Sequence, residues 1–130
     1  MTGSLFERCK RVAAWVCIGV IGILSLLPAA EVAPLRTSMG GHVEHLLTHA
    51  VTSLITAIAY LDHSRFRIAG GLILYAAVLE FLQRYSPGRL SSFEDLAFSS
   101  AGIILGLAIF QLVQQVRARQ ASGSRSPTGM

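Results

Sequence analysis

Four stretches of the chain are nearly free of charge and long enough to form helices that cross a lipid bilayer. They are residues 12–28, 43–61, 68–85 and 94–113, near the short end of the roughly 17–25 residues that span a hydrocarbon core. Backbone N–H and C=O groups find no water inside a bilayer, so such stretches must fold as helices. Because the connections between them are short, we predict an all-α membrane protein with four transmembrane helices in an antiparallel bundle.

Composition agrees with a membrane protein and argues against two other classes. Hydrophobic residues make up 52% of the chain and charged residues only 14%, which is unusual for a soluble domain. The net charge of +4 comes from basic residues that flank the apolar stretches rather than from one basic face, so no nucleic-acid partner is expected. Cys9 and Cys17 lie eight residues apart on one predicted helix, about 12 Å, which is too far for a disulfide between them.

The distribution of basic residues predicts the orientation of the bundle. With the N-terminus inside the cell, the cytoplasmic segments contain eight basic residues, and the outer loops contain only Arg36, Arg84 and Arg89. Cytoplasmic loops of membrane proteins carry the excess of Lys and Arg. An even number of spans then places both termini in the cytoplasm.

The two ends of the chain are predicted to lie outside the bundle. Residues 1–11 form a short cytoplasmic N-terminus, and residues 114–130, rich in Ser, Arg and Gly, form a disordered cytoplasmic tail. An alternative for the first span is a signal peptide cleaved after Ala30, although Pro28 then occupies a position where a small residue is preferred. No internal repeat or second domain is indicated.

The polar stretch from Glu80 to Asp95 is the predicted functional site. It lies between the third and fourth spans, at the outer face. Glu80, Gln83 and Arg84 share one helical face, and a carboxyl group below the membrane surface must turn inward and find a partner. The structural alternative is an ion pair between Glu80 and Arg84 or Arg89 that only ties two helices together.

Arg84 and Arg89 are predicted to bind a phosphate or carboxylate of a lipid headgroup, because a guanidinium matches these groups with two parallel hydrogen bonds. The alternative is nonspecific contact with headgroups. For Asp95 the alternative to a ligand-binding role is stabilisation of the N-terminus of its own helix.

His45, His49, Thr52 and Thr56 lie on one face of the second span. The spacing of His45 and His49 could serve a metal, but the metalloprotease motif is absent and hydrogen-bonded interior histidines are the favoured interpretation. No metal or other cofactor is expected. Because three of the spans meet at the outer face, His45, Glu80, Gln83, Arg89 and Asp95 are predicted to line one shallow pocket.

The pattern resembles the VanZ-like family of small bacterial membrane proteins. The matching features are His45, Glu80-x-x-Gln83, Pro87-Gly88-Arg89, Asp95 followed by Gly102 and Gly106, and Ser25-Leu-Leu-Pro28 at the end of the first span. The chain differs from the family pattern at Gly41-His42, His49 and Ser99. The resemblance implies a multi-pass protein of the bacterial inner (plasma) membrane, linked to glycopeptide resistance or surface-polysaccharide biology.

Two classes of function stay open. The first is a non-enzymatic envelope protein that binds a membrane lipid, a lipid-linked envelope precursor or another membrane protein. The second is a small membrane enzyme acting on a lipid phosphate or lipid-linked sugar, with His45 or Glu80 as general base and the arginines holding the anion. A transporter is a weaker third alternative, because the chain has no inverted repeat.

Overall fold

The computed structural model describes residues 2–36, 38 and 40–123; for residues 2 and 3 it describes only the backbone. These residues form helices and no strand, so the all-α prediction is confirmed for them. The elements are α1 (Thr2–Leu26), α2 (Ala29–Val32), the 3₁₀ helix η1 (Ala33–Leu35), α3 (Gly41–Ala59), α4 (Arg65–Leu82), the 3₁₀ helix η2 (Gln83–Tyr85) and α5 (Phe93–Gly123).

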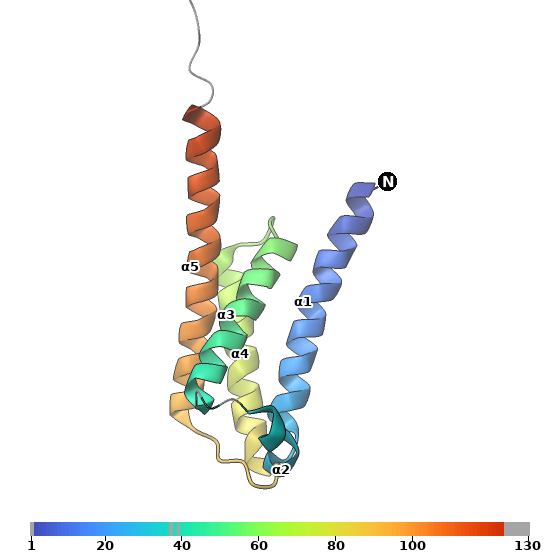
Figure 1. The fold of residues 1–130 in the computed structure, drawn as a ribbon, viewed down its shortest axis with the longest axis vertical. Coiled ribbons are helices and arrows are strands. Elements are labelled where there is room, and N and C mark those ends of the chain that lie inside the picture. Colours follow the sequence, from blue (N-terminus) through green and yellow to red (C-terminus); the bar gives the residue numbers. More distant parts are fainter. Residues whose placement is uncertain (1, 37, 39, 124–130) are drawn as a thin grey trace, which may run out of the picture.

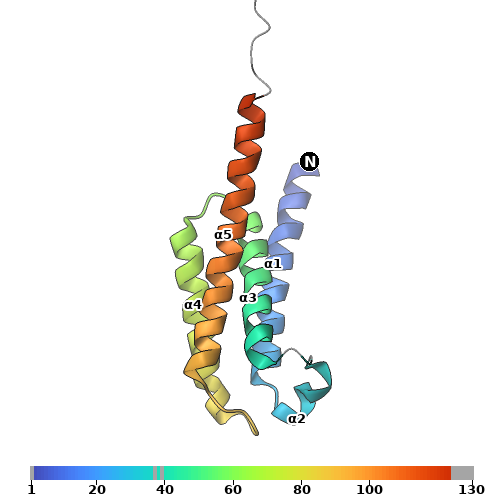
Figure 2. The ribbon, with the colours of Figure 1, turned by 60° about the vertical axis from the view of Figure 1, so that its left-hand side comes forward.

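The four long helices alternate in direction (Figure 1). The chain descends along α1, rises along α3, descends along α4 and rises along α5. The start of α1 and the end of α5 therefore lie at one end of the molecule, and α2 and the α4–α5 connection lie at the other (Figure 2). We call the end that carries α2 the α2 end.

Three helical segments are long and apolar enough to cross a membrane: Ser4–Leu26, Arg65–Tyr85 and Phe93–Gly123. Helix α3 is not among them. It has 19 residues, but Glu44 and the histidines at 42, 45 and 49 lower its average hydropathy. The prediction of four spanning helices is therefore supported for three of them.

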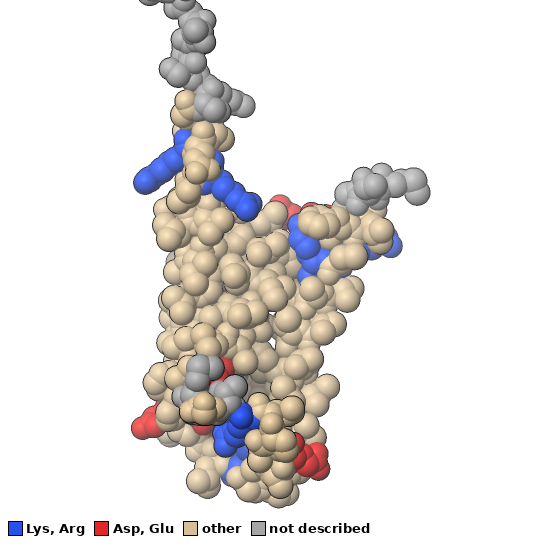
Figure 3. Space-filling model, viewed as in Figure 1, with Lys and Arg blue, Asp and Glu red and all other residues tan. Residues whose placement is uncertain are grey.

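The surface and the interior have the polarity expected in a lipid environment. Many large apolar side chains are exposed, among them Val20, Leu74 and Ile104, while a set of polar side chains is buried: His49, Thr52, Ser53, Thr56, Glu80, Gln83 and Ser99. Figure 3 shows mostly Lys and Arg with a small acidic patch near the upper end, mixed charges at the α2 end, and a broad uncharged band between them. Soluble proteins rarely expose apolar patches of this extent.

Helices α3 and α5 approach closely through two glycines. A Cβ atom on Gly102 would overlap the carbonyl oxygen of Leu46, and one on Gly106 would overlap the carbonyl of Ala50 and the hydroxyl of Ser53. Small residues spaced by four let helix backbones come together in this way. Beyond them a core cluster joins α3, α4 and α5 and consists of Ala57, Ile68, Leu72, Ile103, Leu107 and Phe110.

Helix α1 is attached to the other helices by side-chain hydrogen bonds. The Tyr75 hydroxyl donates to the Ile18 carbonyl at 2.7 Å, and Gly22 leaves the space that the Tyr75 hydroxyl occupies. Nearer the other end, Trp15 Nε1 donates to the Tyr60 hydroxyl at 2.8 Å. The first helix is therefore fixed to α3 and α4 at two levels.

Two predicted boundaries differ from the structure. Helix α1 begins at Thr2 rather than near residue 12, because no proline interrupts the chain before Pro28 and Glu7 pairs with Lys10 at 2.7 Å. The tail predicted to be disordered from residue 114 is helical as far as Gly123, so that prediction was wrong for residues 114–123. Gln, Arg and Ala favour helix there, and no Gly or Pro interrupts them. The remaining predicted tail, 124–130, lies outside the described residues.

The α4–α5 connection folds back onto α2. Ala29 N donates to the Pro87 carbonyl at 3.1 Å, and Gly88 has a φ of +74°, a conformation that glycine adopts most readily. Ser92 then caps α5, with its hydroxyl accepting from Glu94 N at 3.1 Å. This connection places Arg89 close to the end of α1.

Candidate functional site

A cavity of about 310 Å³ lies at the α2 end, between α1 and α3. Its apolar wall consists of Ile21, Leu24, Val32, Leu35 and Leu47. The polar side chains that line it are Ser25, Arg36, Glu44, His45, Thr48, His49, Gln83 and Arg89. A mostly apolar cavity with a few polar groups is the usual form of a ligand site. We call it the α1–α3 cavity.

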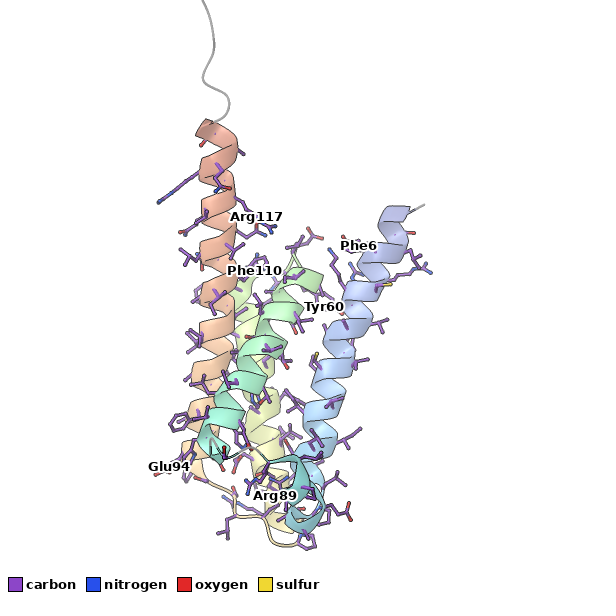
Figure 4. The ribbon with its side chains drawn as sticks, viewed as in Figure 1. Phe6, Tyr60, Arg89, Glu94, Phe110 and Arg117 are labelled. Carbon is purple, nitrogen blue, oxygen red and sulfur yellow. The ribbon has the colours of Figure 1, made fainter. Side chains whose placement is uncertain are left out.

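Arg89 binds the open end of α1. Its Nε donates to the Leu27 carbonyl at 3.3 Å and its Nη2 to the Leu24 carbonyl at 2.6 Å. The last carbonyls of a helix have no partner within the helix, and cations are favoured beside them. Figure 4 shows Arg89 at the α2 end, between α2 and the ends of α3 and α4. Arg89 thus has a structural role in addition to lining the cavity.

The cavity carries two arginines without a carboxylate partner. Among the described residues no Asp or Glu oxygen lies within 4.0 Å of a guanidinium nitrogen of Arg36 or Arg89. Burial lowers the pKa of Arg89, the charge of Arg36 lowers it further, and Glu80 and Asp95 oppose the shift. An arginine nonetheless stays protonated at neutral pH. The carboxylate of Glu44 also lines the cavity, so the lining carries two positive charges against one negative charge. An anion bound beside Arg36 and Arg89 would relieve the repulsion between these two arginines.

The two histidines point their Nδ1 atoms at different partners. His45 Nδ1 lies 3.2 Å from the Ser99 hydroxyl on α5. His49 Nδ1 donates to the His45 carbonyl at 2.8 Å, since a carbonyl can only accept. His49 Nε2 is buried and has no hydrogen-bond partner among the described residues. The predicted polar face of this helix is confirmed as an inward face, because His49, Thr52 and Thr56 are all buried.

Glu80 and Arg84 line a different hollow of about 200 Å³, between α4 and the start of α5. Glu80 is 7% exposed, and its Oε1 accepts a hydrogen bond from Ser92 N. Arg84 is exposed and its guanidinium lies 5.3 Å from the centre of the Phe81 ring. The ion pair considered between Glu80 and an arginine is not found among the described residues; Glu80 ties α4 to α5 through the backbone of Ser92 instead.

Asp95 lines neither hollow and pairs with a histidine. His42 Nδ1 lies 2.9 Å from Asp95 Oδ1, and His42 Nε2 lies 3.3 Å from Glu94 Oε2. The His42 ring also stacks on Phe98, with centroids 4.9 Å apart. Glu94 and Asp95 occupy the first turn of α5, as predicted. The group therefore connects the N-terminal ends of α3 and α5.

The structure thus divides the predicted site residues among three places. His45, His49, Gln83 and Arg89 line the α1–α3 cavity, Glu80 and Arg84 line the second hollow, and Asp95 binds His42. The prediction that His45, Glu80 and Asp95 share one pocket was wrong. The reason is that the backbone N–H of Ser92 and the side chain of His42 satisfy the two acids locally.

The sequence reasoning did not identify Arg36 as a site residue. Arg36 follows η1 and lines the cavity beside Arg89, but its position in a short loop counted only toward the orientation of the bundle. A usable signal was its place in the short loop directly after the first span, at the same end of the bundle as Arg89. Among the described residues, no group of three or more His, Cys, Asp or Glu side chains is arranged to hold a metal ion.

No family model, curated protein or solved structure matches the chain.

Proposed function

We propose that the chain is a VanZ-like protein of the bacterial inner membrane, with four spans, that binds an anionic lipid or lipid-linked envelope molecule in the α1–α3 cavity. The resemblance rests on residues of which His45, Gln83 and Arg89 line this cavity together. The role is non-enzymatic binding in cell-envelope biology, in surface-polysaccharide synthesis or in glycopeptide resistance.

The fourth span in this proposal is α3. At about 1.5 Å per residue its 19 residues extend about 28 Å, close to the thickness of a hydrocarbon core. Among its buried polar side chains, His49 lines the cavity and Ser53 packs against Gly106 of α5, while Val51 and Ile58 are exposed. Polar groups that face the bundle interior are compatible with a span.

The orientation can be tested by cysteine labelling from outside the cell. In a background with Cys9→Ala and Cys17→Ala, we expect Ser38→Cys, at the α2 end, to react with a membrane-impermeant maleimide. Ser64→Cys, in the α3–α4 turn at the other end, should react only after the membrane is opened. Reaction of Ser64→Cys in intact cells would reverse the proposed topology, and equal protection of both sites would argue against four spans.

The observation that carries the binding proposal is the combination of an apolar wall with two arginines that lack a carboxylate partner. Asp95 pairs with His42 and Glu80 with the backbone of Ser92. Glu44 lines the same cavity but forms no salt bridge within 4.0 Å with either arginine. A phosphate or carboxylate is the natural partner of paired guanidinium groups. The apolar wall suits an attached hydrocarbon chain, which favours a lipid-type ligand over a bare inorganic anion.

Arg36→Ala tests the proposal with little risk to the fold, because Arg36 is exposed and makes no hydrogen bond to the helices through its side chain. We expect it to weaken binding of phosphatidylglycerol in nanodiscs about tenfold, or about 1.4 kcal/mol, while phosphatidylcholine binding stays unchanged. Arg67→Ala, which removes an exposed arginine at the start of α4, at the opposite end of the molecule, is the matched control. Equal phosphatidylglycerol affinity for wild type and Arg36→Ala would remove the basis of the proposal.

A second candidate function is catalysis on a lipid phosphate. The observation that favours it is the stacked pair of His45 and His49, with ring centroids 6.1 Å apart, lining the same cavity as the arginines. Ser99 beside His45 is buried in the α3–α5 interface and does not line the cavity, so it is not placed as a nucleophile. Release of inorganic phosphate from phosphatidic acid that His45→Asn abolishes would establish the enzyme instead.

A further inference from the structure

Two uncharged polar side chains lie deep in the α1–α3 cavity. Gln83 is 3% exposed and His49 is 6% exposed, and both line the cavity. Binding of an anion does not explain either side chain, because Arg36 and Arg89 already supply the positive charge that an anion needs. Buried polar side chains nearly always have hydrogen-bond partners, so these two call for an explanation.

Both side chains have unused hydrogen-bonding capacity. With Nδ1–H given to the His45 carbonyl, the neutral His49 ring offers a lone pair on Nε2. A second proton on this buried ring would be costly without a counter-charge. The Gln83 side-chain amide makes no hydrogen bond among the described residues and can both donate and accept. Together they form a neutral polar surface that can accept a hydrogen bond at two points and donate at one.

A hydroxyl group matches this surface, because it donates and accepts at the same oxygen. We propose that the ligand of the α1–α3 cavity carries hydroxyl groups beside its phosphate, as a polyol or sugar phosphodiester does. Gln83 and His49 bind the hydroxyls, and Arg36 and Arg89 bind the phosphate. This inference rests on the proposed anion binding and adds the class of headgroup.

Selectivity follows from the cost of leaving buried polar groups unpaired. A site built to hydrogen-bond a hydroxyl rejects an analogue that lacks it, because the analogue displaces water and restores no hydrogen bond. We therefore expect about tenfold weaker binding of an anionic lipid with no headgroup hydroxyl. Charge alone cannot produce this difference when the two lipids carry the same charge.

Phosphatidylglycerol and phosphatidylethanol provide the matched pair, since both are phosphodiesters with one negative charge and only the first has headgroup hydroxyls. Binding to the full-length protein is measured in nanodiscs of phosphatidylcholine doped with either lipid. We expect wild type to prefer phosphatidylglycerol about tenfold. Gln83→Leu and His49→Phe should each reduce the preference to twofold or less, because each weakens phosphatidylglycerol binding more than phosphatidylethanol binding.

The outcomes separate this inference from the proposal on which it depends. Equal wild-type affinity for the two anionic lipids, both above phosphatidylcholine, overturns the hydroxyl inference and leaves anion binding intact. No preference for either over phosphatidylcholine overturns the proposed function itself. Gln83→Leu and His49→Phe that weaken both anionic lipids equally would assign these side chains a structural role and also overturn the inference. The comparison of the two lipids uses wild-type protein alone. It therefore stays decisive even if Gln83→Leu or His49→Phe fails to fold.

A further measurement identifies the source of the headgroup. Glycerol 3-phosphate that displaces phosphatidylglycerol from wild type, but not from Gln83→Leu, supports recognition of the headgroup alone. Preference for phosphatidylglycerol without displacement by glycerol 3-phosphate supports a lipid whose chain contacts the apolar wall. Displacement that is equal in wild type and Gln83→Leu contradicts the assigned role of Gln83.

Discussion

Replacing Gly106 by leucine is expected to destabilise the protein by about 3 kcal/mol, because overpacking a tight helix contact forces the backbones apart. A Cβ at this position overlaps the carbonyl of Ala50 and the hydroxyl of Ser53. Neither can move away easily, since the first belongs to the α3 backbone and the second donates to that same carbonyl at 3.0 Å. The measurement is reversible unfolding in mixed detergent micelles followed by circular dichroism.

Gly70→Leu is the control for this prediction. Nothing lies within 4 Å of a Cβ built on Gly70, so the same chemical change should alter the free energy of unfolding by less than about 1 kcal/mol. Gly106→Ala should fall between the two. If Gly106→Leu unfolded like wild type, the close approach of α3 and α5 would be wrong.

Replacing Glu80 by alanine is expected to lower the free energy of unfolding by about 2 kcal/mol. The change removes the acceptor for Ser92 N, and hydrogen bonds to charged groups contribute about 1.5–3 kcal/mol. It also loosens the start of α5, because Ser92 holds that end of the helix. The Ser92 hydroxyl accepts from Glu94 N and the Ser92 carbonyl accepts from Leu96 N. Amide hydrogen exchange at residues 90–96 should accelerate more than exchange in the α3–α5 interface.

Glu80→Gln distinguishes this structural role from catalysis. Its amide oxygen can still accept from Ser92 N, so we expect a loss below about 1 kcal/mol. Glu31→Ala, on exposed α2, is the control for removing an acid at the same end of the molecule. If Glu80→Ala were as stable as wild type, the structural role of the Glu80–Ser92 hydrogen bond would be contradicted. The same conclusion would follow if Glu80→Gln lost an activity while its stability stayed unchanged.

The sequence determined the kind of protein because hydrophobicity and helix breakers act locally. Inside a bilayer, an uncharged stretch long enough to span it must satisfy its own backbone hydrogen bonds and therefore forms a helix. Pro28, which cannot continue a helix, ends the first of them, and Ser86-Pro87-Gly88 separates the last two. The four-residue spacing of Gly102 and Gly106 is one that permits a close helix contact, and α5 presents both glycines to α3. Helix ends were less predictable, as α5 shows, because polar helix formers carry it past its apolar segment.

The tertiary structure decided which polar residues share a site. Because three spans meet at the outer face, Glu80 and Asp95 were expected to join His45 and Arg89 in one pocket, but a polar group in an apolar bundle takes the nearest adequate partner. For Glu80 that partner is the backbone of Ser92, and for Asp95 it is His42. The Arg89 side chain turns to the carbonyls that end α1 and so reaches the cavity that Arg36 shares. Hydrophobic patterning fixes helices one segment at a time, whereas these pairings depend on distances between segments that only the packed bundle sets.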